Sequence, residues 1–121
     1  MMYFIYLLRC VNNSLYCGYT TDLAKRMHSH LYEKSGAKYT KIFVPVGIAC
    51  AWRIEAGLSL TLKIEYTIKQ LSKEKKEALV NGGNLMDIIQ YIQAAADVVI
   101  SRITQDDLEN IWNKLPSLRM L

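Results

Sequence analysis

The chain has 121 residues and a mass of 13.9 kDa, of which 51% are hydrophobic and 21% charged. This length and composition predict one compact domain with a single apolar core, and they exclude a disordered chain or a disulfide scaffold. The longest apolar run, Met1 to Leu8, is much shorter than the roughly 20 residues that cross a bilayer, so no membrane partner is expected. Three cysteines, without C-x-x-C spacing, favour a reducing cytoplasmic location.

The net charge of +4 is divided unevenly along the chain. Residues 1–80 carry twelve Lys and Arg against six Asp and Glu, a net charge of +6, whereas residues 81–121 carry three against five, a net charge of −2. The basic part is typical of a protein that contacts a polyanion, and the acidic, apolar part of one that contacts protein. Ordinary surface charge is the alternative explanation.

A β-hairpin and an amphipathic helix are the first elements that the sequence predicts. The hairpin joins the apolar segments 1–10 and 15–19, which a short polar stretch separates. Thr21 or Asp22 caps a helix that extends to about Tyr32. The apolar face of this helix consists of Leu23, Met27 and Leu31.

A basic loop, a third strand and two further helices are expected next. Residues 34–41 are predicted to form the loop, and residues 46–54, which are rich in β-branched side chains, the strand. A second helix is expected to begin near residue 57, and a third to span residues 73–80 and end at the breaker 81–83. The apolar face of the second helix consists of Leu60, Ile64, Ile68 and Leu71.

The Asn-Gly-Gly breaker is the internal boundary that the sequence indicates. We therefore expect one domain over residues 1–80 and a helical extension over residues 81–121, packed on that domain or on a partner. Capping signals at residues 84 and 104 predict that the extension is a helical hairpin, and a second copy of the chain or another protein could bind through residues 84–121. The predicted apolar stripes are Leu85, Ile88, Ile92, Ala96, Val99 and Ile103, then Leu108, Ile111, Trp112 and Leu115.

Two tripeptides near the N-terminus carry the first functional signal. Phe4-Ile5-Tyr6 and Tyr16-Cys17-Gly18 resemble the paired tripeptides that name the GIY-YIG nuclease superfamily. Cross-strand aromatic packing is the alternative explanation of the tyrosine pair alone. The resemblance covers about residues 3–80 and is to the small, single-domain bacterial branch. It continues through Gly18-Tyr19-Thr20-Thr21-Asp22-Leu23, Arg26, His30, Gly36-Ala37-Lys38-Tyr39-Thr40, Pro45-Val46 and the segment from Lys63 to Ser72.

This resemblance implies an α+β fold with a small three-stranded antiparallel sheet flanked by helices. It also implies DNA as the partner, and an endonuclease that hydrolyses phosphodiester bonds with one divalent metal ion, Mg²⁺ or Mn²⁺. Substrate selection by DNA structure, in repair or recombination, would suit a chain without a separate sequence-reading module. A nucleic-acid-binding or adaptor protein that keeps this fold without turnover is the alternative. Phe4 and Cys17 depart from the family's tripeptides, and we interpret both as characteristic of the branch.

Five residues match the family's catalytic positions. The resemblance implies that Tyr16 is the general base and that Tyr6 helps to orient the attacking water. It assigns Arg26 to the scissile phosphate, His30 to hydrogen bonding or proton relay, and Glu65 to the metal ion. Arg26 and His30 lie four residues apart and therefore share one face of their predicted helix.

Two alternatives to the metal assignment remain open. An ion pair with Lys69, four residues further along the helix, is the simpler explanation of Glu65. Glu55 is the second candidate for the metal-binding carboxylate, and it would be preferred if it lay beside Arg26. A basic rim for the phosphate backbone is expected as well, with Tyr39 either stacked on a splayed base or closed over the site. The lysines of this rim are Lys25, Lys34, Lys38, Lys41, Lys63 and Lys69.

The proposed use of both tyrosines makes a geometric prediction about the hairpin. A loop of two residues would place Tyr6 and Tyr16 on opposite faces of the sheet. A loop with an odd number of residues, or a bulge, places both on one face. We predict the odd loop or the bulge.

Overall fold

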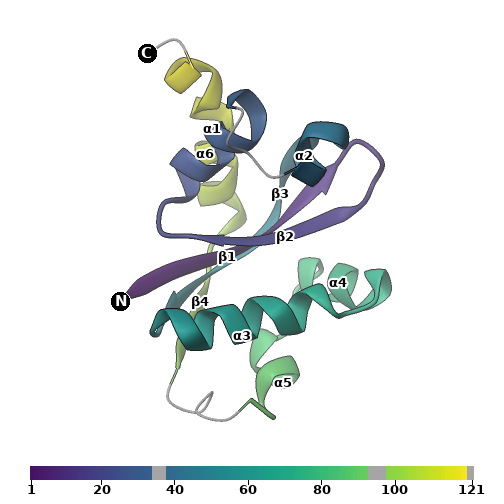
Figure 1. The fold of residues 1–121 in the computed structure, drawn as a ribbon, viewed down its shortest axis with the longest axis vertical. Helices are drawn as coiled ribbons and strands as arrows, with labels where there is room; N and C mark the ends of the chain where they lie inside the picture. The colour runs from purple at the N-terminus through teal and green to yellow at the C-terminus, as the bar shows by residue number, and fades with distance from the viewer. Residues whose placement is uncertain (34–37, 93–97, 120–121) are drawn as a thin grey trace.

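An antiparallel β-sheet organises the chain, and the computed structural model describes residues 1–33, 38–92 and 98–119 of it (Figure 1). The strand order is β2-β1-β3-β4, which leaves β2 and β4 at the two edges. The chain is therefore α+β, as predicted, but the sheet has four strands instead of three. The strands are β1 (Met2–Cys10), β2 (Leu15–Thr20), β3 (Pro45–Glu55) and β4 (Val99–Arg102).

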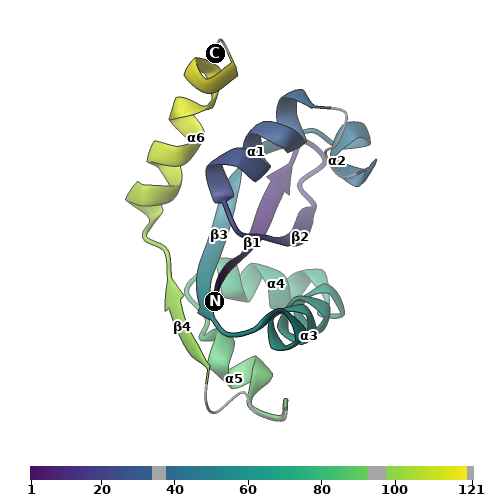
Figure 2. The ribbon, with the colours of Figure 1, turned by 60° about the vertical axis from the view of Figure 1, so that its left-hand side comes forward.

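Helices cover both faces of the sheet (Figure 2). One core lies between the sheet and α3, α4 and α5, and the other between the sheet and α1 and α6. Side chains alternate along β1, so Ile5 and Leu7 belong to the first core, and Tyr6 and Leu8 to the second. The helices are α1 (Leu23–Tyr32), α2 (Lys38–Ile42), α3 (Leu58–Lys69), α4 (Lys73–Val80), α5 (Leu85–Ile89) and α6 (Gln105–Arg119).

The hairpin between β1 and β2 has the odd loop that the two tyrosines require. Tyr6 is paired with Gly18 and Leu8 with Tyr16, so Tyr6 and Tyr16 share one face of the sheet. Asn13 has a φ of 65°, a left-handed conformation that asparagine tolerates, and its N–H donates to the Cys10 carbonyl at 2.8 Å. The prediction that both tyrosines face the same side is confirmed.

The predicted helical hairpin is wrong in its first half. A short helix, α5, is present, but the end of the predicted stripe forms β4, in which Val99 is paired with Glu55 and Arg102 with Trp52. Consecutive β-branched residues restrict the side-chain rotamers in a helix and suit a strand, and the free edge of β3 supplies the backbone partners. Periodicity alone could not show that this edge was available. Residues 93–97, which include Ala96, lie outside the described residues.

The second half of the extension is helical. The Thr104 hydroxyl accepts a hydrogen bond from the Asp107 N–H at 3.2 Å, as the capping signal predicted. Leu108 and Leu115 of α6 are buried in the same core as Tyr6 and Met27. These contacts use the apolar face of α6 within this chain, while the division of the chain at residue 80 and the expected partner stay predictions.

A second expectation that needs correction concerns the basic loop. Its last part forms the short helix α2, and residues 34–37 lie outside the described residues. The other helices begin close to where their capping residues predicted: the Asp22 carboxylate accepts from the Lys25 N–H, and the Ser72 hydroxyl from the Lys75 N–H. Within the described ranges, no helix is long and apolar enough to span a bilayer.

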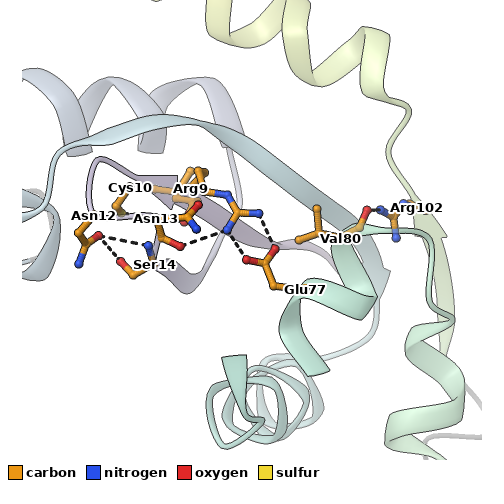
Figure 3. A network of polar contacts seen from close by, with 9 residues as sticks. Arg9, Cys10, Asn12, Asn13, Ser14, Glu77, Val80 and Arg102 are labelled. Atoms are coloured by element: carbon orange, nitrogen blue, oxygen red, sulfur yellow. Dashed lines mark hydrogen bonds and ion pairs between the residues drawn. The ribbon is translucent and has the colours of Figure 1, made fainter. Parts of the chain in front are cut away.

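Two arginines tie α4 to the rest of the fold (Figure 3). Arg9 of β1 forms a bidentate ion pair with Glu77 and also donates to the Asn13 carbonyl in the hairpin loop at 3.2 Å. Arg102 of β4 donates to the carbonyl oxygens of Leu79 and Val80 at 2.7 and 2.8 Å. These carbonyls lie at the end of α4, where helical carbonyls lack partners within the helix.

Candidate active site

Tyr6 lies flat over the neighbouring strand because its partner there is a glycine. A Cβ atom built on Gly18 would overlap the hydroxyl and the adjacent ring carbon of Tyr6. Any larger residue at this position would therefore displace the tyrosine ring. With Gly18 present, the ring is 1% exposed and its hydroxyl points towards α1 residues.

A chain of buried hydrogen bonds joins β1, α1 and α2. The Tyr6 hydroxyl lies 2.8 Å from His30 Nε2, and His30 Nδ1 lies 2.9 Å from the Thr40 hydroxyl. All three side chains are at most 3% exposed. The Arg26 guanidinium can only donate, and it hydrogen-bonds the Tyr6 oxygen, which leaves the Tyr6 proton to be donated to His30.

Burial holds this cluster in its neutral forms. Burial raises the pKa of Tyr6 well above its usual range, although the hydrogen bond and positive charge of Arg26 act in the opposite direction. Burial, with the positive charges of Arg26 and Lys41, lowers the pKa of His30 to about 4. At neutral pH, Tyr6 is therefore a phenol and His30 an uncharged imidazole.

Tyr16 joins this cluster to the molecular surface. Its ring packs edge-on against His30, with the ring centroids 5.5 Å apart, and stacks against Tyr39, with the centroids 5.8 Å apart and the planes at 18°. The Tyr39 hydroxyl donates to the Ser14 hydroxyl at 2.6 Å, which ties α2 to the hairpin loop. Tyr39 thus already stacks on a protein ring, although 37% of it is exposed.

A cleft of about 410 Å³ opens at the β2 edge of the sheet. Tyr16 and Tyr39 line one side of it, and three lysines come from the end of α3 and from α4 on the other side. The cleft therefore places aromatic rings opposite positive charges. Its lining residues are Ser14, Leu15, Tyr16, Cys17, Tyr39, Lys69, Lys73 and Lys76.

Glu65 approaches the same edge from the opposite face of the sheet. It lies on α3, is 8% exposed, and its Oε1 is 3.4 Å from Lys69 Nζ. Cys17 of β2 lies in the core that includes Ile64 and Ile68 of α3. Burial and, less strongly, the charge of Glu65 raise the pKa of the Cys17 thiol to about 12. Cys17 is therefore a thiol at neutral pH and is not expected to act as a nucleophile.

The donor chemistry around Glu65 fits a hard divalent ion. Mg²⁺ prefers oxygen ligands and keeps several waters, so one carboxylate and a substrate phosphate can hold it. Within the described residues, no three His, Cys, Asp or Glu side chains form a closed ligand set. Glu55 is paired with Met2 at the far end of β3, four residues from Ala51, the partner of Tyr6. Four residues of strand are roughly 13 Å, so Glu55 does not replace Glu65 as the candidate ligand.

Tyr6, Tyr16, Arg26 and His30 thus form one cluster, and Glu65 lies across the β2 edge from it. The described lysines that were predicted to form a basic rim are spread over α1, α2 and α3. Lys25, Lys38 and Lys63 are exposed, and the exposed Lys41 donates to the Glu33 carbonyl. Lys34 lies outside the described residues.

Sequence reasoning missed four residues of this region. Thr40 and Gly18 were within quoted motifs, but their contacts with His30 and Tyr6 depend on the packing of α2 and on strand register. Lys73 and Lys76 belong to the run Lys73-Glu74-Lys75-Lys76, which was assigned only to a charged helix. This run, close after Lys69, was the signal that could have found them.

Similarity to known proteins shows the family of the chain. The GIY-YIG catalytic domain family matches residues 2–78. A UPF0213 protein of Vibrio cholerae is 43% identical over 90 residues, which covers 74% of this chain and 88% of that protein. A UPF0213 protein of Bacillus velezensis is 44% identical over 78 residues, which covers 64% of this chain and 77% of that protein.

A solved structure is also similar. The solution NMR structure of a UPF0213 protein from Bacillus halodurans is 33% identical and matches with a TM-score of 0.45, covering 77% of this chain and 98% of that one. Because the family match spans well over half of the chain, the protein belongs to the GIY-YIG family, a family of nucleases. The two relatives and the solved structure described above all carry the designation UPF0213. The strand β4 and helix α6 lie outside the matched residues.

Proposed function

We propose that the protein is a metal-dependent endonuclease that hydrolyses DNA phosphodiester bonds and selects its substrates by DNA structure, as in repair or recombination. The observation that carries this proposal is the buried Tyr6–His30–Thr40 chain beside Tyr16, which lines a lysine-rich cleft. Buried polar chains require every member to be satisfied, and they fix side-chain positions closely. Such a chain next to an open cleft is well suited to proton handling at a phosphate.

The two tyrosines differ in what they can do. Burial keeps the proton on Tyr6, so its oxygen holds Arg26 and its hydroxyl orients His30. Tyr16 lines the cleft and is accessible to water. In the proposed reaction, Tyr16 acts as the phenolate after its own proton has passed to solvent. It takes a proton from the attacking water while the water oxygen bonds to phosphorus, the bond from phosphorus to the leaving oxygen breaks, and the leaving oxygen takes a proton from solvent.

Arg26 and Glu65 are assigned to the charge of the reacting phosphate. The guanidinium presents planar donors that match phosphate oxygens, and it stabilises the negative charge that grows as water attacks. Glu65 would hold Mg²⁺ or Mn²⁺, which supplies Lewis-acid stabilisation of the phosphate oxygens when bound. Lys69 Nζ lies 3.4 Å from Glu65 Oε1 in this structure, so the ammonium group has to move aside before the carboxylate can bind the ion.

The proposed location of the protein is the reducing cytoplasm. Cys10, Cys17 and Cys50 are all buried and free, which supports the reducing cytoplasm.

The test is cleavage of linear, flap, four-way-junction and single-stranded DNA with Mg²⁺, Mn²⁺ or a chelator. We expect metal-dependent cleavage that Glu65→Ala and Tyr16→Phe each lower by at least about 100-fold, because each removes a group that acts on the reacting atoms. Glu55→Ala is the matched control and should cleave like the parent protein, because Glu55 is exposed at the far end of β3.

Each other outcome changes the assignment in a defined way. DNA binding without cleavage in every metal would replace the enzyme with the non-catalytic adaptor. Loss of cleavage in Glu55→Ala but not in Glu65→Ala would move the metal to Glu55.

A further inference from the structure

The lysines of the cleft come from two consecutive helices. Lys69 is the last residue of α3, and Lys73 and Lys76 lie in the first two turns of α4. The turn between these helices brings them to the same side of the cleft, opposite Tyr16 and Tyr39. Three positive charges therefore converge beside the candidate general base.

Two of these lysines form no close ion pair among the described residues. In the part of the chain that the structure describes, Lys69 pairs with Glu65, whereas the side chains of Lys73 and Lys76 make no ion pair or hydrogen bond. The carboxylate one residue after Lys76 is Glu77, and Arg9 engages both of its oxygens. Arg9 is thus the main partner of Glu77, and Lys73 adds only the weaker attraction of its charge, since the Arg9 hydrogen bond and then the charges of Arg9 and Lys73 lower the pKa of Glu77.

The position of these lysines also opposes the stability of α4. Positive side chains in the first turn of a helix face the positive end of its dipole and are unfavourable by a few tenths of a kcal/mol each. Lys73, Lys75 and Lys76 all stand there, with Glu74 as the acidic residue of the turn. Positive charges held where they oppose the helix dipole and form no close ion pair favour an external anionic partner.

We propose that the phosphate backbone of bound DNA leaves the reacting phosphate across the β2 edge and runs over the start of α4, where Lys73 and Lys76 each bind a phosphate. This inference rests on the proposed function for the position of the reacting phosphate. A lysine ammonium binds phosphate as a point charge without reading sequence, which suits an enzyme that selects DNA by structure. The track is distinct from the exposed lysines of α1 and α2, because α4 and α1 pack on opposite faces of the sheet.

The test measures how DNA binding depends on salt, in the presence of a chelator so that the DNA stays intact. Each lost phosphate contact lowers the slope of log K against log salt by about 0.9 on duplex DNA and about 0.7 on single strands. We expect the double variant Lys73→Ala/Lys76→Ala to lower the slope by roughly 1.4 to 1.8. Lys73→Arg/Lys76→Arg should keep the slope of the parent protein, because it keeps both charges.

The matched control removes two charges from elsewhere. Lys75 lies on α4 but lines a different hollow with Tyr91, and Lys114 lies on α6, so Lys75→Ala/Lys114→Ala should leave the slope nearly unchanged. Lys73, Lys75 and Lys114 are exposed and Lys76 is half-buried, so unfolding curves for all variants check that the fold is intact.

Three results would overturn the proposal. They are an unchanged slope in Lys73→Ala/Lys76→Ala, an equal loss in the control pair, and an absence of DNA binding by the parent protein. The cleavage assay on the same proteins separates this proposal from the enzyme proposal. A reduced slope without any cleavage would support the track and contradict the nuclease.

Discussion

At the scale of single residues, the candidate site depends on a glycine, Gly18, as much as on the polar side chains in it. Gly18 carries no Cβ, so the Tyr6 ring can lie against β2 with its hydroxyl 2.8 Å from His30. The glycine of the second tripeptide is therefore required by close approach and not by backbone conformation, since its φ is not positive. The tripeptide pair is a packing unit, in which each tripeptide constrains the other.

Gly18→Ala should lower both stability and cleavage. The added methyl group has to displace the Tyr6 ring, which is destabilising by about 1–3 kcal/mol and breaks the hydrogen bond to His30. Gly47→Ala on β3 is the matched control, because nothing lies within 4 Å of its added Cβ. Urea unfolding of the two variants measures the difference. Equal stability of the two variants would contradict the account.

His30 should make the fold sensitive to mild acid. Its pKa is lowered from 6.5 to about 4 in the folded chain, so between these values the unfolded chain binds a proton that the folded chain does not. The free energy of unfolding from this residue is therefore fully present above pH 6.5 and falls as the pH drops towards 4, by about 1.4 kcal/mol per pH unit and at most about 3.5 kcal/mol.

The measurement is urea unfolding at about pH 7 and about pH 5 for the parent protein and for His30→Gln. The parent protein should lose about 2 kcal/mol more than the variant over this interval. The same loss in both proteins would show that other groups cause the pH dependence.

At the scale of elements, β4 does more than extend the sheet. Arg102 reaches from β4 to the end of α4 and donates to two of its last carbonyls, while Arg9 holds the same helix through Glu77. The helix that carries Lys73 and Lys76 is thus fixed from both sides. The strand β4, which lies outside the residues that the family matches, therefore helps to fix the helix that lines the candidate site.

Arg102→Ala should destabilise the protein by about 1–3 kcal/mol, because two carbonyls at the end of α4 lose charge-assisted hydrogen bonds. Arg53→Ala removes the same charge from the neighbouring strand, where Arg53 is exposed and donates to the Met2 sulfur, and should change stability by less than about 0.5 kcal/mol. Thermal unfolding compares the two. If Arg53→Ala were the more damaging, the capping role of Arg102 would be wrong.

At the scale of the whole molecule, the two cores share one sheet but serve different parts of the site. The core with α1 and α6 buries Tyr6 and the helix that carries Arg26 and His30, and the core with α3, α4 and α5 positions Glu65 and the α4 lysines. Tyr16 and Cys17, adjacent on β2, face these two sides in turn. The cleft lies where both layers meet at the β2 edge.

Leu108→Ala should test whether α6 is an integral part of this arrangement. Leu108 is 2% exposed in the core that holds Tyr6, so its truncation should lower the free energy of unfolding by about 2–5 kcal/mol. Leu58→Ala, at a leucine that is 43% exposed, is the control and should lower it by less than about 1 kcal/mol. A small effect at Leu108 would mean that α6 is only loosely attached to the domain.

The sequence by itself determined the local features of this protein. Alternation and turn residues predicted the hairpin, and capping residues predicted where α1 and α4 begin. The shared face of Tyr6 and Tyr16 was predicted from the use of both tyrosines that the family resemblance implies. These features depend on neighbouring residues only, which is why composition and spacing suffice. The family resemblance likewise depends on motifs that are read along the chain.

Only the tertiary structure decided what lies between distant segments. It turned residues 99–102 into a strand, because the free edge of β3 offered hydrogen bonds that helical periodicity does not reveal. It placed Thr40 on His30 and brought Lys73 and Lys76 opposite Tyr16, contacts that depend on how helices pack on the sheet. Such contacts are set by the shape and burial of whole layers, and the linear order of residues does not contain them.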